Sequence, residues 1–468
     1  MQRTVDPIRA FVTHFQRARY DDLPAQVIEA VKITILDTMG AALAGSSSEA
    51  GRGIARVAQR YGGTTGGTLV AHGVNVAAPM AVLANGVMAR CRELDGTHET
   101  GGGHVGVSIV PAAFAIAETA TSPVSGRDLT LGIALGVDML CRLRMGAGKS
   151  VAIGWMAETM APMSIAAVGA KLLMLDEERM LDAIGLAYAS CSGNVQPTVE
   201  GAWSLWVPAG SAGANGILAL DMAREGFLGP RNPLCGEFGL YRLYFRGDYD
   251  ESALLGELGE RNEITNSSLK PYPTCKYTHH AIATTLRLVS TNRLTPGQIK
   301  RVTVTTNTMG ATQCGFDATG APKTNPETPG AAKFSIPFTV AAALVDGCVR
   351  LGQFDEASLH RGDILALAQK VEAFVDSDIE REWSRNISPA QLQIEMHDGA
   401  THKLRVDWPL GHPSRPMSSD DFDTKAMDCL RASARPLRDD ASHQLRRLIA
   451  RLEALDDVRA LAHVLKPA

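Results

Sequence analysis

The sequence predicts a mainly α-helical protein with an inserted α+β domain, and three patterns along the chain support this prediction. Apolar residues recur at helical spacing through most of residues 1–268. Near residue 270 the pattern changes to the alternation typical of strands, and after Pro409 helical spacing returns. We therefore expect two domains, an all-helical domain of residues 1–268 plus 409–468 and an α+β domain of residues 269–408.

The helical domain is predicted from a series of Ala-rich amphipathic segments. The first clear helix opens after Pro24 and runs to a stop at Gly45. The low aromatic content of 5% and the many small residues favour closely packed helices. Ser108 is a candidate N-cap, and Pro111 fits the first turn of the same helix. Further helices are expected at 77–92, 108–120, 129–143, 159–173, 177–191 and 212–226.

The α+β domain is predicted from two alternating segments. Residues 301–306 alternate Val and Thr, which indicates a strand, and residues 391–408 read as a hairpin around the turn Asp398-Gly399. Helices are expected at 278–290 and 341–346. After this domain, residues 419–434 and 438–465 return to helix, and we expect these last helices to pack back on the helical domain.

One long segment has no clear pattern. Residues 307–332 are rich in Gly, Thr, Pro and Asn, and such a stretch inside a compact domain is often a lid or a binding loop. It leads into Lys333 and Ser335, which would bring a cation and a hydroxyl to a pocket. An N-cap role for Ser335 fits the same residues.

Composition narrows the class of protein. The 468 residues carry a net charge of -4, so no overall field favours nucleic acid or an anionic membrane. The eight cysteines form no C-x-x-C pair, which argues against a zinc ribbon or an iron–sulfur loop. No segment approaches the ~20 apolar residues of a membrane span, and the first twenty residues lack the apolar stretch of a signal peptide. We expect a cytoplasmic protein with no metal site of these kinds.

The first candidate site is the segment 93–104, which reads ELDGTHETGGGH. The acids Glu93 and Asp95 and the histidines His98 and His104 stand beside a glycine-rich turn before a helix. This composition suits acid–base chemistry, and exposed N–H groups there would hold an anion. A solvated turn fits the same residues.

The second candidate site is the segment 270–280, KPYPTCKYTHH, at the predicted domain boundary. Its prolines fix the backbone around Lys270, and its cations and hydroxyls suit carboxylate recognition. An ordinary linker with surface charges is the alternative. Cys275 has no local base except His279, so a packed cysteine is favoured over a nucleophile.

Several motifs together resemble the MmgE/PrpD family, which includes 2-methylcitrate dehydratases, cis-aconitate decarboxylase and iminodisuccinate epimerase. The resemblance implies a helical domain made from both chain ends, an inserted α/β domain as a cover, an active site between domains, no cofactor and a homodimer. The matching stretches are ILDTMGAALAG (35–45), ANGVMARCRELDGTH (84–98), HVGVSIVPAAFAIAE (104–118), KPYPTCKYTHHAI (270–282), AAKFSIPFTVAAALVDG (331–347) and GHPSRPMS (411–418).

The resemblance also places individual residues. Asp95 and Thr97 fall on the acid-and-threonine motif, and His104 matches the histidine that follows it. Lys270 and His279 match the lysine and histidine of the second motif. Two further positions of these motifs carry a different residue: Glu93 stands where an Asp is usual, and Cys275 stands where the decarboxylase has His. Elsewhere in the chain, three polar positions have become apolar: Met156, Leu205 and Phe338 replace a His, a Lys and a Tyr.

These residues lead to a hypothesis for function. His104 is the candidate base, oriented by Asp95, while Lys270 and N–H groups near 101–105 stabilise the developing carboxylate charge. His279 or Lys270 would be the acid. The candidate substrate-binding residues are Glu93, Thr97, Gly103, Cys275, Lys333 and Ser335. We expect a dehydratase of a small di- or tricarboxylic acid, similar to 2-methylcitrate dehydratase; a dicarboxylate epimerase and a non-catalytic carboxylate-binding protein are the alternatives.

Overall fold

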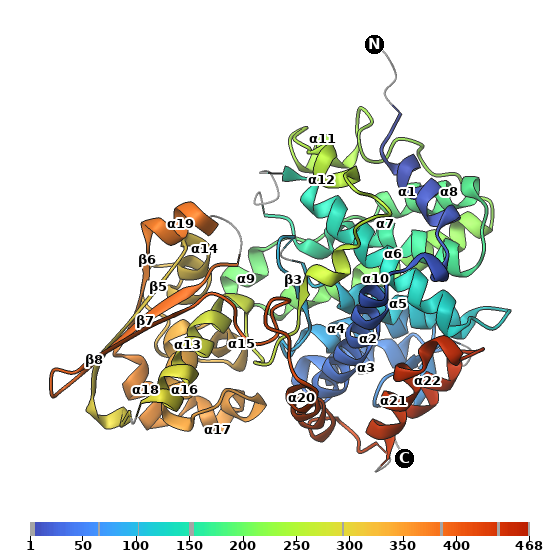
Figure 1. Ribbon diagram of the computed structural model, residues 1–468. Helices are drawn as coiled ribbons and strands as arrows, with labels where there is room; N and C mark the ends of the chain where they lie inside the picture. Colours follow the sequence, from blue (N-terminus) through green and yellow to red (C-terminus); the bar gives the residue numbers. More distant parts are fainter. Residues whose placement is uncertain are drawn as a thin grey trace. The chain divides into compact units, whose positions relative to one another are not determined.

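The computed structural model describes residues 5–63, 66–101, 103–148, 154–292, 294–383, 387–437 and 440–466. The chain forms two compact units. Unit 1 contains the residues up to Gln196, Ser204–Ser267 and the residues from Asp423 onward, and unit 2 contains Pro197–Trp203 and Ser268–Phe422. The mainly helical protein with a small sheet domain in its C-terminal part is confirmed (Figure 1).

Unit 1 is built almost entirely of helices, and their bounds lie close to those predicted from apolar spacing. Side-chain caps mark several starts: the Ser125 hydroxyl accepts the Asp128 N–H, and the Asp176 carboxylate accepts the Arg179 N–H. The elements are α1 (Ile8–Arg17), α2 (Ala25–Ser46), α3 (Glu49–Arg60), β1 (Gly67–Leu69), β2 (Val74–Val76), α4 (Ala78–Arg90), α5 (Gly106–Thr119), α6 (Gly126–Met145), α7 (Ala161–Leu172), α8 (Glu177–Tyr188), α10 (Val207–Arg224), α11 (Leu240–Tyr244), α12 (Glu251–Leu255), α21 (Ala441–Ala450) and α22 (Arg459–Val464).

Small residues allow two of these helices to touch backbone to backbone. A side chain at Gly86 of α4 would come within 2.7 Å of the Gly210 Cα of α10, and one at Gly210 would come within 2.1 Å of the Leu83 carbonyl oxygen. Only glycine fits at such a crossing. The close helix packing expected from the composition is confirmed here.

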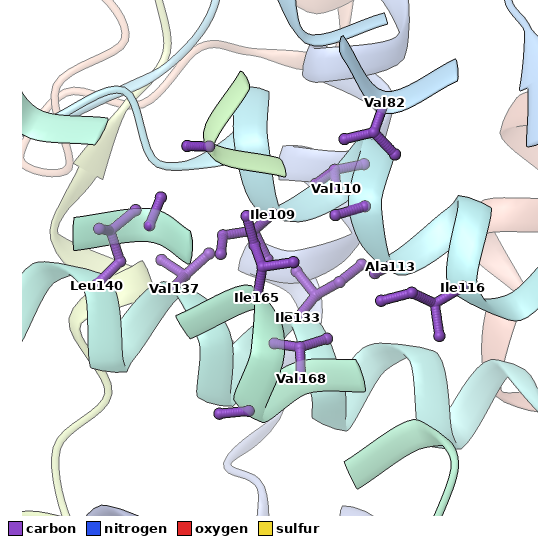
Figure 2. Close-up of a cluster of buried hydrophobic side chains, with 14 of the residues drawn as sticks. Val82, Ile109, Val110, Ala113, Ile116, Ile133, Val137, Leu140, Ile165 and Val168 are labelled. Atoms are coloured by element: carbon purple, nitrogen blue, oxygen red, sulfur yellow. The ribbon is translucent and has the colours of Figure 1, made fainter. Parts of the chain in front are cut away.

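Part of the core of unit 1 surrounds α5, which packs against α4, α6 and α7. Figure 2 shows Ile109 of α5, Ile133 and Val137 of α6 and Ile165 of α7 grouped together, with Val110 of α5 on the side toward α4. All five side chains are fully buried. Burial of this kind contributes about 1.5–3 kcal/mol for each large aliphatic side chain. The segment that joins α4 to α5 carries the first candidate site.

Unit 2 is a four-stranded sheet in the order β6-β5-β7-β8, with α13 and α16 packed against it (Figure 1). The predicted strand and hairpin are confirmed: Val302 lies opposite Ile394, and Asp398-Gly399 forms the hairpin turn. The elements are α13 (His279–Thr291), β5 (Ile299–Thr306), α14 (Thr308–Gly310), α15 (Pro329–Lys333), α16 (Ile336–Asp346), α17 (Glu356–Leu359), α18 (Gly362–Ala368), β6 (Val371–Val375), α19 (Ser377–Trp383), β7 (Ala390–Met396) and β8 (Thr401–Val406).

Three elements span a boundary between the units: α9 (Gln196–Glu200), β4 (Ser267–Ser268) and α20 (Ser419–Arg431). Unit 2 extends to Phe422, beyond residue 408, the end expected for the α+β domain.

Some local predictions were wrong. Helix α5 begins at Gly106, so Ser108 lies inside it and donates its hydroxyl to the Ala209 carbonyl rather than capping, and Pro111 is an internal residue. The predicted helix 438–465 is broken into α21, a 3₁₀ turn at Leu452–Ala454 and α22, while residues 438 and 439 lie outside the described residues. The segment 307–332 contains α14, a π turn at Ala311–Gly315 and the start of α15.

Candidate functional site

The first candidate site is the connection between α4 and α5. Helix α4 ends at Arg90, and Glu93 follows with a left-handed backbone, φ 56°. A non-glycine residue in this conformation costs about 1–3 kcal/mol, and such strain is concentrated at functional sites. Residues Thr97 and His98 are extended as β3 before the chain enters α5 at Gly106.

Asp95 and His104 form a close pair within this connection. The His104 Nδ1 lies 2.6 Å from the Asp95 Oδ2. Asp95 is fully buried, while the His104 side chain keeps 15% of its surface exposed. Because a carboxylate only accepts, Nδ1 carries the hydrogen and Nε2 of the neutral ring carries the lone pair. Asp95 therefore orients the His104 ring so that its basic nitrogen, Nε2, is the one that lies away from the carboxylate.

A buried arginine, which the sequence analysis missed, connects the acids of this segment. The guanidinium of Arg90 donates to the Glu93 carboxylate and lies 3.9 Å from Asp95. Burial lowers the pKa of Arg90, but the negative charges of Glu93, Asp95 and Glu158 outweigh burial, so the pKa is raised overall. One guanidinium therefore faces three carboxylates in the interior of unit 1. The sequence did contain a signal for this ion pair, because Arg90 stands three residues before Glu93 at the end of a helix.

A second ion pair clamps the turn that carries Asp95. The Asp37 carboxylate of α2 accepts the Gly96 N–H at 2.9 Å and pairs with the ammonium of Lys425 from α20. The same ammonium donates to the Leu94 carbonyl oxygen at 2.6 Å. Burial raises the pKa of Asp37 above its ordinary value, and the charge of Lys425 opposes that shift. Residues from both ends of the chain thus fix the backbone on either side of Asp95.

His98 has a different role from His104. Its Nδ1 accepts the Gly101 N–H at 2.7 Å, so its Nε2 carries the hydrogen and donates to Glu263 at 3.1 Å. Burial raises the pKa of Glu263, but the hydrogen bond from His98 and the charge of Arg261 outweigh burial and lower it. Both ring nitrogens of His98 are occupied and the side chain is fully buried, so this histidine holds the turn in place.

The other predicted residues of this segment lie close to the Asp95–His104 pair. The Thr97 side chain is buried, and its hydroxyl has no hydrogen-bond partner among the described residues. The Gly103 carbonyl accepts the His98 N–H, and a side chain at Gly103 would come within 3.2 Å of the Ala157 Cβ. The N–H of Gly101 is used by His98, and Gly102 lies outside the described residues.

The second candidate site lies in unit 2 and is rich in buried cations. Lys270, Lys276 and Lys333 are at most 4% exposed. The His279 Nε2 lies 3.4 Å from the Thr274 carbonyl oxygen, a contact that requires hydrogen on Nε2. Burial, together with the charges of Lys276 and Lys270, lowers the pKa of His279 well below its ordinary value. The ring is therefore neutral, and its single N–H faces the Thr274 carbonyl, so it is a poor proton donor for a leaving group.

Two sequence motifs meet in unit 2. The Cys275 N–H donates to the Lys333 carbonyl oxygen at 3.0 Å, which brings the segment 270–280 beside the end of α15. Cys275 is buried, in agreement with a packed cysteine. The Ser335 hydroxyl accepts the Phe338 N–H and donates to the Lys323 carbonyl, so Ser335 caps α16.

The three apolar departures noted in the sequence are buried. Leu205 packs in unit 1 with Val87, Cys91 and Trp206, and Met156 is 8% exposed. Phe338 is fully buried in unit 2, with its ring 6.1 Å from that of Phe354. These positions provide hydrocarbon surface where a His, a Lys or a Tyr was expected.

Among the described residues, no group of three or more His, Cys, Asp or Glu side chains is arranged to hold a metal ion. None of the helices in the described part of the chain combines the length and apolar character needed to cross a bilayer.

Comparison with known proteins fits this two-unit architecture. The chain is similar to cis-aconitate decarboxylase of Aspergillus terreus, 24% identical over 95% of this chain and 93% of that protein. It is 25% identical to human cis-aconitate decarboxylase over 98% of this chain and 94% of that protein. The model of the MmgE/PrpD N-terminal domain matches residues 9–252, and that of the C-terminal domain matches residues 272–451. With both domain models matched in order, the chain belongs to the MmgE/PrpD family.

Proposed function

We propose that this protein is a lyase that removes a proton from the carbon next to a carboxylate of a small di- or tricarboxylic acid. The 2.6 Å contact between His104 and the buried Asp95 supports the proposal most directly. Asp95 fixes the tautomer in which Nε2 is the base, and it stabilises the imidazolium that forms when the proton arrives.

Loss of this proton places negative charge on the oxygens of the substrate carboxylate. That charge requires cations or hydrogen-bond donors. In our proposal the buried lysines of unit 2, Lys270 foremost, bind the substrate carboxylates, because the acids around Arg90 give the interior of unit 1 the opposite charge. The Thr97 hydroxyl, which has no partner in the described part of the chain, is a further donor for the substrate.

Dehydration also needs an acid for the departing hydroxide. A neutral His279 whose Nε2–H faces a carbonyl is unsuited to this step, so the proposal assigns the acid to Lys270. In the complete reaction His104 takes the proton from carbon, the electron pair forms the alkene, and hydroxide leaves with a proton as water.

Dehydration is favoured here over decarboxylation of cis-aconitate, the activity in the names of the relatives. Met156 and Leu205 place apolar groups where the family resemblance implied a His and a Lys. A hydroxy acid that is smaller or less charged than either cis-aconitate or 2-methylcitrate matches this change. Epimerisation uses the same proton abstraction, followed by return of a proton to the opposite face.

The test is to incubate the protein in deuterium oxide with citrate, 2-methylcitrate, malate and cis-aconitate, and to follow each acid by proton NMR. Alkene formation supports dehydration, and deuterium uptake with inverted configuration supports epimerisation. Raised thermal stability with an acid that neither exchanges nor reacts would contradict the enzymatic proposal and favour a binding protein.

We also propose that the protein forms a homodimer through the outer face of α10. Leu218 and Met222 are 48% and 37% exposed, and Phe227 and Leu228 just beyond the helix are 58% and 74% exposed. Contiguous apolar side chains at a surface are typical of interfaces. Sedimentation should give a dimer for the wild type and for the control Met174→Glu, and a monomer for Leu218→Glu; a dimer in all three would contradict the assignment.

A further inference from the structure

The carboxylate of Glu158 is buried in unit 1 without a hydrogen-bond partner. The residue lies in the 3₁₀ turn η3 (Ala157–Met160) that leads into α7, and it is 1% exposed. Neither carboxylate oxygen has a hydrogen-bond partner among the described residues. The proposed proton transfer between carbon and His104 makes no use of this group.

Glu158 belongs to the same cluster as the Asp95–His104 pair. Its charge acts on the guanidinium of Arg90, which already donates to Glu93 and lies 3.9 Å from Asp95. The preceding residue, Ala157, lies against Gly103, the residue before His104. Glu158 is therefore connected to the segment of the candidate base in two ways, through the charge of Arg90 and through the packing of Ala157 against Gly103.

Such a group is costly for folding. A buried polar group that lacks its hydrogen bonds destabilises the folded state, and a buried charge does so more strongly. The buried Asp182 of unit 1, in contrast, accepts the Gly229 N–H and pairs with Arg231. The absence of comparable hydrogen bonds at Glu158, within the described chain, indicates that a ligand supplies them.

We infer that Glu158 recognises the substrate by accepting a hydrogen bond from a donor beside its carboxylates: the hydroxyl that dehydration requires, or an amino nitrogen. The inference rests on the proposed function and narrows its substrate class. A carboxylate accepts hydrogen bonds and donates none, and it repels the carboxylates of a substrate. Glu158 therefore selects hydroxy or amino acids over unsubstituted polycarboxylates. One hydrogen bond to a charged group corresponds to about 10- to 100-fold in affinity.

Pairs of acids that differ only in the donor test this selection. Titration calorimetry should show that citrate binds at least about 10-fold more tightly than tricarballylate, or that malate or aspartate does so relative to succinate. Malate against aspartate then distinguishes a hydroxyl from an amino donor. Glu158→Met removes the acceptor and should abolish the preference within each pair, while Glu158→Gln should reduce it. The control Asp182→Asn should keep it.

Stability without ligand gives an independent measurement. Because Glu158 lacks hydrogen bonds, Glu158→Met should unfold at a midpoint about 2 °C or more above the wild type, whereas Asp182→Asn should unfold below it. Three results would overturn this inference and leave the proposed function standing. They are a preference for the donor that survives in Glu158→Met, equal binding within every pair by the wild type, and a lowered unfolding midpoint in Glu158→Met. Failure of the wild type to bind any of these acids contradicts the proposed function itself.

Discussion

Replacing Asp95 by asparagine tests the base assignment with the smallest change in shape. The carboxylate lies 2.6 Å from the His104 Nδ1 and is fully buried, so solvent does not replace it when its charge is removed. The asparagine amide also presents an N–H to Nδ1. The ring then takes the opposite tautomer, with hydrogen on the Nε2 that should accept the substrate proton.

The expected loss of rate follows from two contributions. A hydrogen bond to a charged group contributes about 1.5–3 kcal/mol, and each 1.4 kcal/mol corresponds to about a tenfold change in rate. The charge alone therefore accounts for about 10- to 150-fold. Reversal of the tautomer removes general-base catalysis as well, and together we expect kcat to fall by about 10²–10⁴-fold with little change in KM.

The assay is deuterium uptake from solvent into the reactive acid, measured by proton NMR at matched enzyme concentrations. Glu263→Gln is the matched control, because it neutralises the partner of His98, whose two nitrogens are already occupied. This control should lower the unfolding free energy and change the exchange rate by less than about tenfold. Exchange by Asp95→Asn within threefold of the wild type would refute the orienting role.

Three further predictions concern stability. Burial lowers the pKa of His279, so below pH 6.5 the unfolded chain binds a proton that the folded chain does not. The unfolding free energy should therefore fall with decreasing pH by up to about 1.4 kcal/mol per pH unit. In urea titrations, His279→Gln should flatten this pH dependence. Lys425→Met leaves Asp37 buried without its cation and should cost about 3–5 kcal/mol by urea unfolding, with partial recovery in the double variant Asp37→Leu/Lys425→Met; no loss would contradict the clamp. Phe338→Tyr buries a hydroxyl in the core of unit 2 and should cost about 1–3 kcal/mol, so an unchanged midpoint would show that a partner is present.

The fold was largely predictable because helical spacing is a local signal. The spacing after Pro24 and the alternation around Val302 each reflect which face of one element is buried, and both are confirmed. Strand β6 was missed because its five residues, Val371–Val375, are too short to show a pattern and form their structure by parallel pairing with β5. The start of α5 was misplaced because the Ser108 hydroxyl bonds to Ala209, a residue far away in the sequence.

The candidate site was predictable only in part, for the same reason. Asp95 and His104 lie in one short segment, and the structure brings them together. The clamp by Lys425 joins residues separated by hundreds of positions, which no spacing reveals. Glu158 gave a weak signal, a lone acid in an apolar run, because its importance depends on burial and on the hydrogen bonds it lacks.

The most direct test of the central claim is deuterium exchange at the carbon next to a substrate carboxylate, compared between the wild type and His104→Gln. We predict that the wild type exchanges this hydrogen in at least one of the hydroxy acids, and that His104→Gln, folded to the same midpoint within a few degrees, loses the exchange by about 10²-fold or more. Exchange that continues undiminished in His104→Gln would contradict the assignment of His104 as the base.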